Sequence, residues 1–313
     1  MTEIIKVEGL VKRYKELIAL DHFSMEVREG EILGLLGPNG SGKSTTINCI
    51  LSLLDFDKGS VKVFGEEMTP RSYELKKKIG IVPQDVTVFE EFNVYENIDF
   101  FCGLYIKDRQ LRKKYVQDAI DFVELNDFVK FRPKKLSGGL QRRLNIACGI
   151  AHKPKLIIFD EPTVAVDPQS RNKILEGIEQ LRKDGATIVY TSHYMEEVER
   201  LADRIIIMDR GKCIAQGTLS ELKNSIRKRE TITVEATGIT KEDLEKIGSF
   251  SSVFSVDYDG EKLRVEAGNG AENICDIVTV LKDGGYNTKS IFSEQPTLND
   301  VFLELTGKKL RDE

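Results

Sequence analysis

The sequence predicts an α/β fold that has a mixed sheet core and a helical subdomain, followed by a small α+β domain of the ferredoxin-like type. Three observations lead to this expectation. The apolar runs 32–36 and 156–159 are typical of parallel strands that helices cover on both faces. A helical face begins at Asn93, and from about Ser220 short strand and helix patterns alternate. We expect domains at residues 1–220, with the helical subdomain at about 86–150, and at 228–313.

Composition narrows the class of protein. The 313 residues, 40% of them apolar, suffice for one large core and a second, smaller one. A formal net charge of -5 does not support binding to nucleic acid. The 5 cysteines have no CxxC spacing, so they fit neither a disulfide framework nor a zinc site. No run reaches the roughly 18 apolar residues that a membrane span needs. We therefore expect a cytoplasmic protein, in which a role at the membrane requires a partner.

The segment GPNGSGKST follows the first apolar run and fits the pattern G-x-x-x-x-G-K-[ST] of a P-loop. Its glycines let main-chain N–H groups converge on one concavity, and a helix expected at 45–51 directs its positive end to the same point. Such a site binds phosphate, which Lys43 would reach, while the Ser44 hydroxyl would bind Mg²⁺. The alternative is a glycine-rich turn with an incidental lysine. The predicted nucleotide-binding residues are Gly37, Pro38, Asn39, Gly40, Ser41, Gly42, Lys43, Ser44 and Thr45.

Two adjacent carboxylates, Asp160 and Glu161, end the apolar run 156–159. The carboxyl ends of strands are where open α/β sheets bind ligands. Beside a triphosphate these carboxylates need a cation, so we predict that Asp160 binds Mg²⁺ and that Glu161 polarises the attacking water. An ordinary acidic turn after a strand is the alternative.

A second glycine pair occurs in LSGGLQ, residues 136–141, just before a helical pattern. Ser137 is the expected N-cap of that helix. Because two glycines weaken a helix start, they indicate that something approaches the backbone closely, and an anion is one candidate. A plain glycine turn into a helix is the alternative.

Taken in order, GPNGSGKST, IVPQD, LSGGLQ, LIIFDEP, VAVDP and YTSHYMEE resemble the motifs of the ATP-binding subunit of an ABC transporter. The resemblance runs from Val7 to about Leu219 and implies the fold of a P-loop ATPase. Within the family, the chain resembles the subunits of drug and antibiotic export systems, because residues 296–302 resemble the end of those ATPases.

This resemblance implies roles for single residues. Tyr14 would stack on the adenine, Gln84 would contact both the metal and the transmembrane partner, and His193 would contact the γ-phosphate in its own subunit. Asp167 would act across the dimer, although Ala165 and Leu140 depart from the commonest family pattern. Each role has an alternative: Tyr14 could cover a sheet edge, Gln84 could form a hydrogen bond within its own loop, and His193 could be a surface histidine. The residues implied to contact the γ-phosphate of the other subunit are Ser137, Gly138 and Gly139.

The implied function is hydrolysis of ATP with Mg²⁺ by a dimer, either a homodimer or one with a related ATPase subunit. Hydrolysis would power a separate membrane permease, for export of a small molecule, from the cytoplasmic face of the membrane. Phe89 and Phe92 lie in the segment where the family docks its membrane partner, with core packing as the alternative. A soluble, nucleotide-switched binding module without a transmembrane partner is the other candidate function.

The last part of the chain predicts a β-α-β-β-α-β order and a closing helix, which indicates a ferredoxin-like unit. A basic link is expected at 223–229. Bracing the dimer, binding a small regulator and contacting the membrane subunit remain open as roles for this unit. Strands are expected at 232–235, 253–258, 262–266 and 288–292, and helices at 241–248, 271–282 and 298–306.

Overall fold

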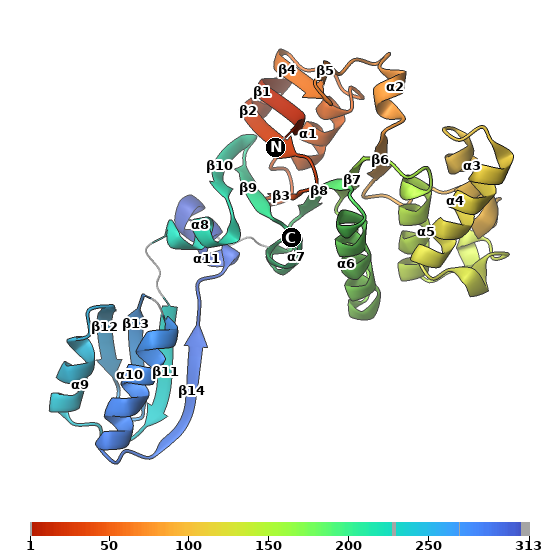
Figure 1. Cartoon of the computed structure of the whole chain (residues 1–313). Helices are drawn as coiled ribbons and strands as arrows, with labels where there is room; N and C mark the ends of the chain where they lie inside the picture. The colour runs from red at the N-terminus through yellow and green to blue at the C-terminus, as the bar shows by residue number, and fades with distance from the viewer. Residues whose placement is uncertain (1, 227–229, 269, 308–313) are drawn as a thin grey trace. The chain divides into compact units, whose positions relative to one another are not determined.

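The structure is a computed structural model that describes residues 2–226, 230–268 and 270–307. The expected domain ends at 228 and 313 lie outside the described residues. The chain divides into two compact units, the first running up to Ser220 and the second beginning at Glu221 (Figure 1). Each unit is described by itself.

Two sheets form the first unit. Their strands are β1 (Glu3–Tyr14), β2 (Leu17–Arg28), β3 (Ile32–Leu36), β4 (Lys58–Val63), β5 (Glu66–Glu67), β6 (Ile79–Val82), β7 (Leu156–Asp160), β8 (Thr187–Ser192), β9 (Arg204–Asp209) and β10 (Lys212–Gly217). The smaller sheet is antiparallel, in the order β2-β1-β4-β5. The larger sheet has the order β10-β9-β3-β8-β7-β6 and is parallel except for its antiparallel edge strand β10. The mixed sheet core predicted from the sequence is thus confirmed.

Strands β3, β7 and β8 of the larger sheet are buried along their whole length, as their apolar sequences predict. Leu33, Ile158 and Val189 share one core with Ile47 of the helix that follows β3. Because β3, β8 and β7 are parallel neighbours, their carboxyl ends meet at one edge of the sheet. The P-loop, the carboxylate pair and the segment that carries His193 all leave the sheet at this edge.

Helices surround this sheet and form a separate cluster beside it. They are α1 (Lys43–Ile50), α2 (Tyr73–Lys76), α3 (Val94–Gly103), α4 (Arg109–Phe122), α5 (Gly138–Ile150), α6 (Pro168–Lys183) and α7 (Met195–Leu201), with short 3₁₀ turns at Asn126–Phe128 and Pro133–Lys135. Helices α3, α4 and α5 pack on one another and form the helical subdomain (Figure 1). The capping box of Asn93 and Glu96 begins α3, as the sequence predicts.

The second unit contains β11 (Glu230–Ala236), α9 (Lys241–Gly248), β12 (Val253–Tyr258), β13 (Lys262–Ala267), α10 (Gly270–Asp283), β14 (Thr288–Glu294) and α11 (Leu298–Thr306). Its antiparallel sheet has the order β12-β13-β11-β14, with the first and third strands in the centre. This is the ferredoxin-like arrangement that the sequence predicts. Ile232, Val234, Leu263 and Val265 form its core together with apolar residues of α9 and α10.

One expectation near the boundary was wrong. The basic segment 223–229 was expected to be a link, but Lys223 lies in the last turn of helix α8 (Leu219–Asn224). Burial of Leu222 anchors this helix, which a count of basic residues does not reveal. Residues 227–229 lie outside the described residues.

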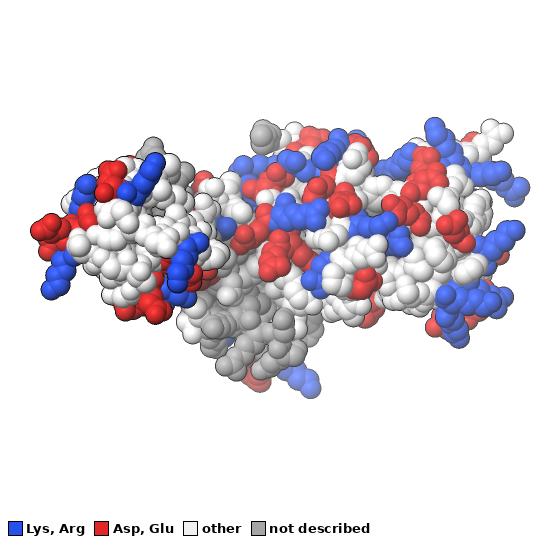
Figure 2. Space-filling model, turned by 90° about the horizontal axis from the view of Figure 1, so that it is seen from below, with Lys and Arg blue, Asp and Glu red and all other residues white. Residues whose placement is uncertain are grey.

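The surface carries both signs of charge. On the face drawn in Figure 2, acidic and basic side chains are interspersed, in keeping with the formal net charge of -5. All five cysteines are free. None of the helices in the described ranges has the length and apolar character needed to cross a bilayer.

Candidate nucleotide-binding site

The loop between β3 and α1 requires glycine at two positions. A Cβ atom on Gly37 would lie 2.5 Å from the carbonyl oxygen of Met208. Gly42 has a φ of +108°, and a Cβ there would lie 2.9 Å from the carbonyl oxygen of Ala19. Side chains are thus excluded at both ends of the loop, and the N-terminus of α1 stays open to a ligand. Ser41 is buried within the loop.

A cavity of about 650 Å³ lies in front of this loop. Its volume is in the range that binds small ligands and cofactors. The predicted site residues that line it are Tyr14, Asn39, Gly40, Gly42, Lys43, Ser44, Thr45, Gln84 and Glu161. The structure therefore brings together residues that are up to about half the chain apart in sequence.

One wall of the cavity is apolar and includes residues that sequence reasoning missed. Tyr14 ends β1 and is paired with Leu17 across the hairpin. Leu17 and Ile18 line the cavity beside Tyr14, and all three side chains are exposed. An exposed aromatic ring with apolar neighbours suits a flat base. Arg210, which follows β9, also lines the cavity, and no motif surrounds it in the sequence.

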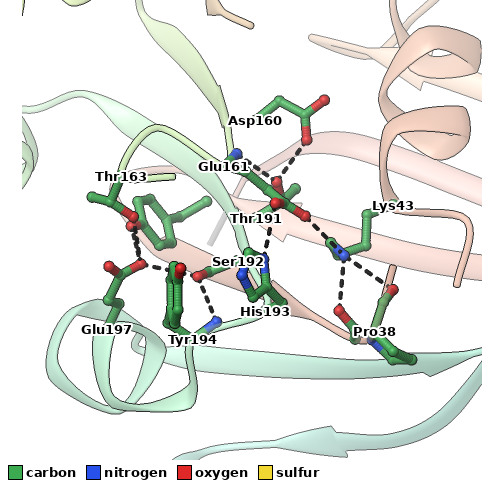
Figure 3. A network of polar contacts seen from close by, with 12 residues as sticks. Pro38, Lys43, Asp160, Glu161, Thr163, Thr191, Ser192, His193, Tyr194 and Glu197 are labelled. Atoms are coloured by element: carbon green, nitrogen blue, oxygen red, sulfur yellow. Dashed lines mark hydrogen bonds and ion pairs between the residues drawn. The ribbon is translucent and has the colours of Figure 1, made fainter. Parts of the chain in front are cut away.

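Lys43, Glu161 and His193 form a chain of polar contacts, in which Lys43 and Glu161 are buried and His193 is partly buried (Figure 3). Lys43 Nζ donates hydrogen bonds to the carbonyl oxygens of Gly37, at 2.8 Å, and Pro38, at 3.2 Å. It also lies 3.0 Å from Glu161 Oε1. The other carboxylate oxygen of Glu161 lies 2.9 Å from His193 Nδ1. Since both Lys43 and Glu161 are almost fully buried, each needs the other as a charged partner.

The ends of β7 and β8 hold the two carboxylates in place. Thr191 Oγ1 donates to Asp160 Oδ1 at 2.7 Å and accepts from the Glu161 main-chain N–H at 3.0 Å. Glu161 has a φ of +47°, a conformation that costs free energy for a residue with a side chain. This backbone turn separates the carboxylates, so that Glu161 reaches Lys43 while Asp160 faces Thr191.

The donor set at this edge suits Mg²⁺ bound together with a nucleotide. Ser44 and Gln84 line the cavity, and Asp160 ends the neighbouring strand β7. Within the described ranges, no group of three or more His, Cys, Asp or Glu side chains could hold a metal ion. Mg²⁺ commonly binds one or two carboxylates together with phosphate oxygens and waters. The carboxylate of Asp160, the hydroxyl of Ser44 and the amide of Gln84 are compatible with this coordination.

Ser137, Gly138 and Gly139 lie at a different place, the start of α5. Ser137 caps the helix, and its Oγ accepts from the Leu140 N–H at 3.3 Å. A Cβ on Gly138 would meet open space, whereas one on Gly139 would lie 2.4 Å from Ser170 Oγ.

Asp167 lies against this helix start. It caps α6, accepting from the Ser170 N–H at 2.9 Å, and this hydrogen bond lowers the pKa of the Asp167 carboxyl. The Cβ position of Gly139 is 3.1 Å from Asp167 Oδ2. The predicted residues therefore fall into two groups within one chain: one around the cavity and one where α5 meets α6.

Comparison with known proteins gives matches along nearly the whole chain. Residues 20–164 match the family model of the ABC transporter, and residues 217–306 match that of the C-terminal domain of DrrA1-3-like ATP-binding proteins. The chain is 37% identical to the linearmycin resistance ATP-binding protein LnrL of Bacillus subtilis, over 99% of this chain and 100% of the relative. It is 32% identical to the Nod factor export ATP-binding protein I of Ralstonia nicotianae, over 99% and 96%.

Among solved structures, the chain resembles a dimeric ATP-binding cassette in a post-hydrolysis state with ADP and Pi. The TM-score is 0.64 at 29% identity, over 69% of this chain and 98% of that one. These matches confirm the resemblance that the order of the motifs indicated. Since relatives at these identities span its whole length, the chain belongs to the ATP-binding subunits of ABC transporters.

Proposed function

We propose that the chain hydrolyses ATP as a dimer and thereby drives a separate membrane permease, bound at its cytoplasmic face, that exports a small molecule. The observation that carries this proposal is the position of the Glu161 carboxylate between Lys43 and His193, at 3.0 and 2.9 Å. The names of the relatives, which refer to antibiotic resistance and to Nod factor export, support export as the direction.

The proposed reaction begins with ATP in the cavity. The adenine stacks on Tyr14, and the phosphates accept hydrogen bonds from the N-terminus of α1. The γ-phosphate replaces Glu161 as the anion beside Lys43, which releases the Glu161 carboxylate to polarise a water molecule. His193 donates a hydrogen bond to the phosphate, where negative charge builds up during transfer.

Mg²⁺ bound to the nucleotide would neutralise charge on the β- and γ-phosphates. Asp160, Ser44 and Gln84 are the residues proposed to hold it. Their neutral and acidic oxygen atoms match the preference of this cation.

The dimer is needed because the second phosphate-binding element lies at the start of α5. The N–H groups there point out of a helix N-terminus, and Gly138 leaves open space in front of them. We propose that Ser137, Gly138 and Gly139 of one subunit close on the γ-phosphate bound by the other. ATP then holds the two subunits together, and its hydrolysis separates them.

A cluster of aromatic rings is the proposed contact with the permease. Phe89, Phe92, Phe100 and Phe101 lie with ring centroids 4.9 to 6.0 Å apart. Phe89 and Phe100 remain 40% and 41% exposed, which is high for apolar rings. Exposed aromatic groups of this kind are enriched at protein interfaces.

Affinity capture from detergent-solubilised membranes of the source cells tests the proposal. We expect a polytopic membrane protein to copurify with the tagged chain, and its recovery to fall when both Phe89 and Phe100 are replaced by Ala. Replacement of Phe254, a still more exposed ring in the second unit at 64%, is the control and should leave recovery unchanged. Recovery of soluble partners alone would contradict the proposal and favour a nucleotide-switched binding module.

A further inference from the structure

A buried carboxylate next to the site has no part in the proposed reaction. Glu197 lies on α7, four residues after His193, and is 3% exposed. Its Oε2 atom accepts hydrogen bonds from Thr163 Oγ1 at 2.9 Å and from Ser192 Oγ at 2.9 Å (Figure 3). The same oxygen atom accepts a third hydrogen bond, from Tyr190 OH at 2.8 Å. The other oxygen, Oε1, forms an ion pair at 3.4 Å with Nε of Arg171 on α6.

These contacts leave the Glu197 carboxylate and its donors little freedom to move. A buried carboxylate is unfavourable unless its charge is compensated, and here three hydroxyl donors and one guanidinium compensate it. Burial, together with the negative charge of Glu197, raises the pKa of Tyr190, so its hydroxyl stays protonated and donates. Because three donors converge on a single oxygen atom, a shift of any one of them weakens its bond to the charged acceptor.

Two of the contacts fix the backbone around His193. Ser192 Oγ donates to Glu197 and also accepts from the Tyr194 N–H at 2.9 Å. This hydroxyl therefore links the residue before His193 to the residue after it. Arg171, the ion-pair partner of Glu197, lies over the Tyr194 ring with its Cζ 4.5 Å from the centroid.

A third contact fixes the turn that follows Glu161. Thr163 is 1% exposed and lies in the turn 161–167, in which Glu161 and Ala165 both have positive φ. The turn ends at Asp167, which caps α6 one helical turn before Arg171. Glu197 therefore binds both ends of this connection, the turn through Thr163 and the helix through Arg171.

We propose that Glu197 is a positioning residue for ATP hydrolysis, which holds the turn 161–167 and the segment 192–194 in one fixed arrangement so that Glu161 and His193 face the same phosphate. The inference rests on the roles proposed above for Glu161 and His193. Glu197 does not line the nucleotide cavity, and its hydrogen bonds go to Thr163, Tyr190 and Ser192, so it acts through its neighbours.

Single-turnover hydrolysis by the full chain, with ATP and Mg²⁺, tests this role. Glu197→Gln keeps the shape of the side chain but replaces the charged acceptor by a weaker one. We expect the rate constant of the single turnover to fall by about tenfold, as expected for weakened hydrogen bonds to a charged group, while the amplitude and the affinity for ATP stay unchanged. Glu196→Gln, which removes the same charge from the exposed neighbour, is the matched control and should hydrolyse ATP at the wild-type rate.

A second set of variants separates positioning from folding. Thr163→Val and Ser192→Ala each remove one donor, and each should slow the single turnover in the wild-type background but not further in Glu197→Gln. If Glu197→Gln fails to fold, Thr163→Val alone must still lower the rate constant. A lower amplitude with an unchanged rate constant would mean that Glu197 only stabilises the fold, and it would overturn the inference. A wild-type chain without any hydrolysis would instead overturn the proposed function.

Discussion

Lys43 and Glu161 form a buried ion pair, with 3.0 Å between Nζ and Oε1, at the mouth of the P-loop. Each side chain is 5% exposed or less, so neither charge has water as an alternative partner. In the proposed reaction, a phosphate that binds Lys43 would take the place of the Glu161 carboxylate, and the lysine would stay paired throughout. Binding of ATP and release of the carboxylate that we propose as the general base would then be the same event.

This relationship leads to a prediction for Glu161→Gln. The amide no longer competes with phosphate for Lys43, so ATP should bind at least as tightly as in the wild type. Turnover should fall by about a hundredfold or more, because general base catalysis contributes about 10² to 10⁴ to the rate. We also expect ATP to trap the variant as a dimer. Calorimetry measures the affinity for ATP, a phosphate-release assay measures turnover, and size exclusion with ATP detects the trapped dimer. Glu74→Gln, which changes an exposed glutamate in the same way, is the control and should behave as the wild type does. Hydrolysis at the wild-type rate would remove Glu161 from the mechanism.

Tyr14 provides a prediction about the base. Tyr14→Ala should raise the Kd for ATP by about tenfold, since stacking of a base on an aromatic ring is worth about 1–3 kcal/mol. Tyr14→Phe keeps the ring and should bind ATP almost as the wild type does. Titration with a fluorescent ATP analogue measures both. Tyr73→Ala, which removes an exposed ring on α2, is the control. Unchanged affinity in Tyr14→Ala would favour the simpler role of covering the sheet edge.

The glycine pair at the start of α5 allows a matched comparison. Gly139→Ala places a Cβ 2.4 Å from Ser170 Oγ, so the contact between α5 and α6 must shift and the unfolding temperature should fall. Gly138→Ala meets nothing within 4 Å and should leave the unfolding temperature unchanged or raise it, because Ala favours helix over Gly by about 1 kcal/mol.

Activity should separate the two variants further. In the proposed dimer the space in front of Gly138 receives the γ-phosphate of the other subunit, so Gly138→Ala should lower turnover despite its intact fold. Thermal unfolding and steady-state hydrolysis, measured on the same preparations, check this pair. Wild-type turnover in a stable Gly138→Ala variant would contradict the proposed contact across the dimer.

Short motifs made much of the fold and of the site predictable. The P-loop, the two carboxylates at the end of β7 and the capping box at Asn93 depend on neighbours within a few residues, so local spacing reveals them. The alternation of apolar residues likewise identified the strands and helices of the second unit, including the exact bounds of α11.

Contacts between distant segments could not be predicted in this way. Leu17, Ile18 and Arg210 line the cavity only because the β1–β2 hairpin and the end of β9 approach the P-loop. In the sequence, Glu197 looks like an ordinary solvent-exposed glutamate of a helix. Only the fold shows that its side chain faces inward, toward Thr163. The expected basic link is another example: because Leu222 is buried, Lys223 lies in helix α8 instead of in a link.

His152 provides a prediction about pH. It is 7% exposed, its ring stacks on Tyr105 with centroids 4.1 Å apart, and its Nε2 lies 3.1 Å from the carbonyl oxygen of Ile79. Since a carbonyl only accepts, the ring donates through Nε2. Burial lowers the pKa of His152 to about 4, so the folded chain keeps the ring neutral where the unfolded chain protonates it. The neutral ring's contribution to stability is therefore complete above pH 6.5 and is lost as the pH falls from 6.5 toward 4.

The expected loss is about 1.4 kcal/mol per pH unit within that window, or about 2–3 kcal/mol between pH 7 and 4.5. Carboxylates also titrate there, so the measurement compares the wild type with His152→Gln, whose amide can still donate to Ile79 but does not titrate. At pH 7 the variant should be the less stable protein, because it lacks the stacked ring. On acidification the difference in free energy of unfolding, followed by urea denaturation, should shrink by about 2 kcal/mol. Parallel curves for the two proteins would mean that the ring accepts a proton in the folded chain as readily as in the unfolded one, and that its burial does not govern the acid sensitivity of this unit.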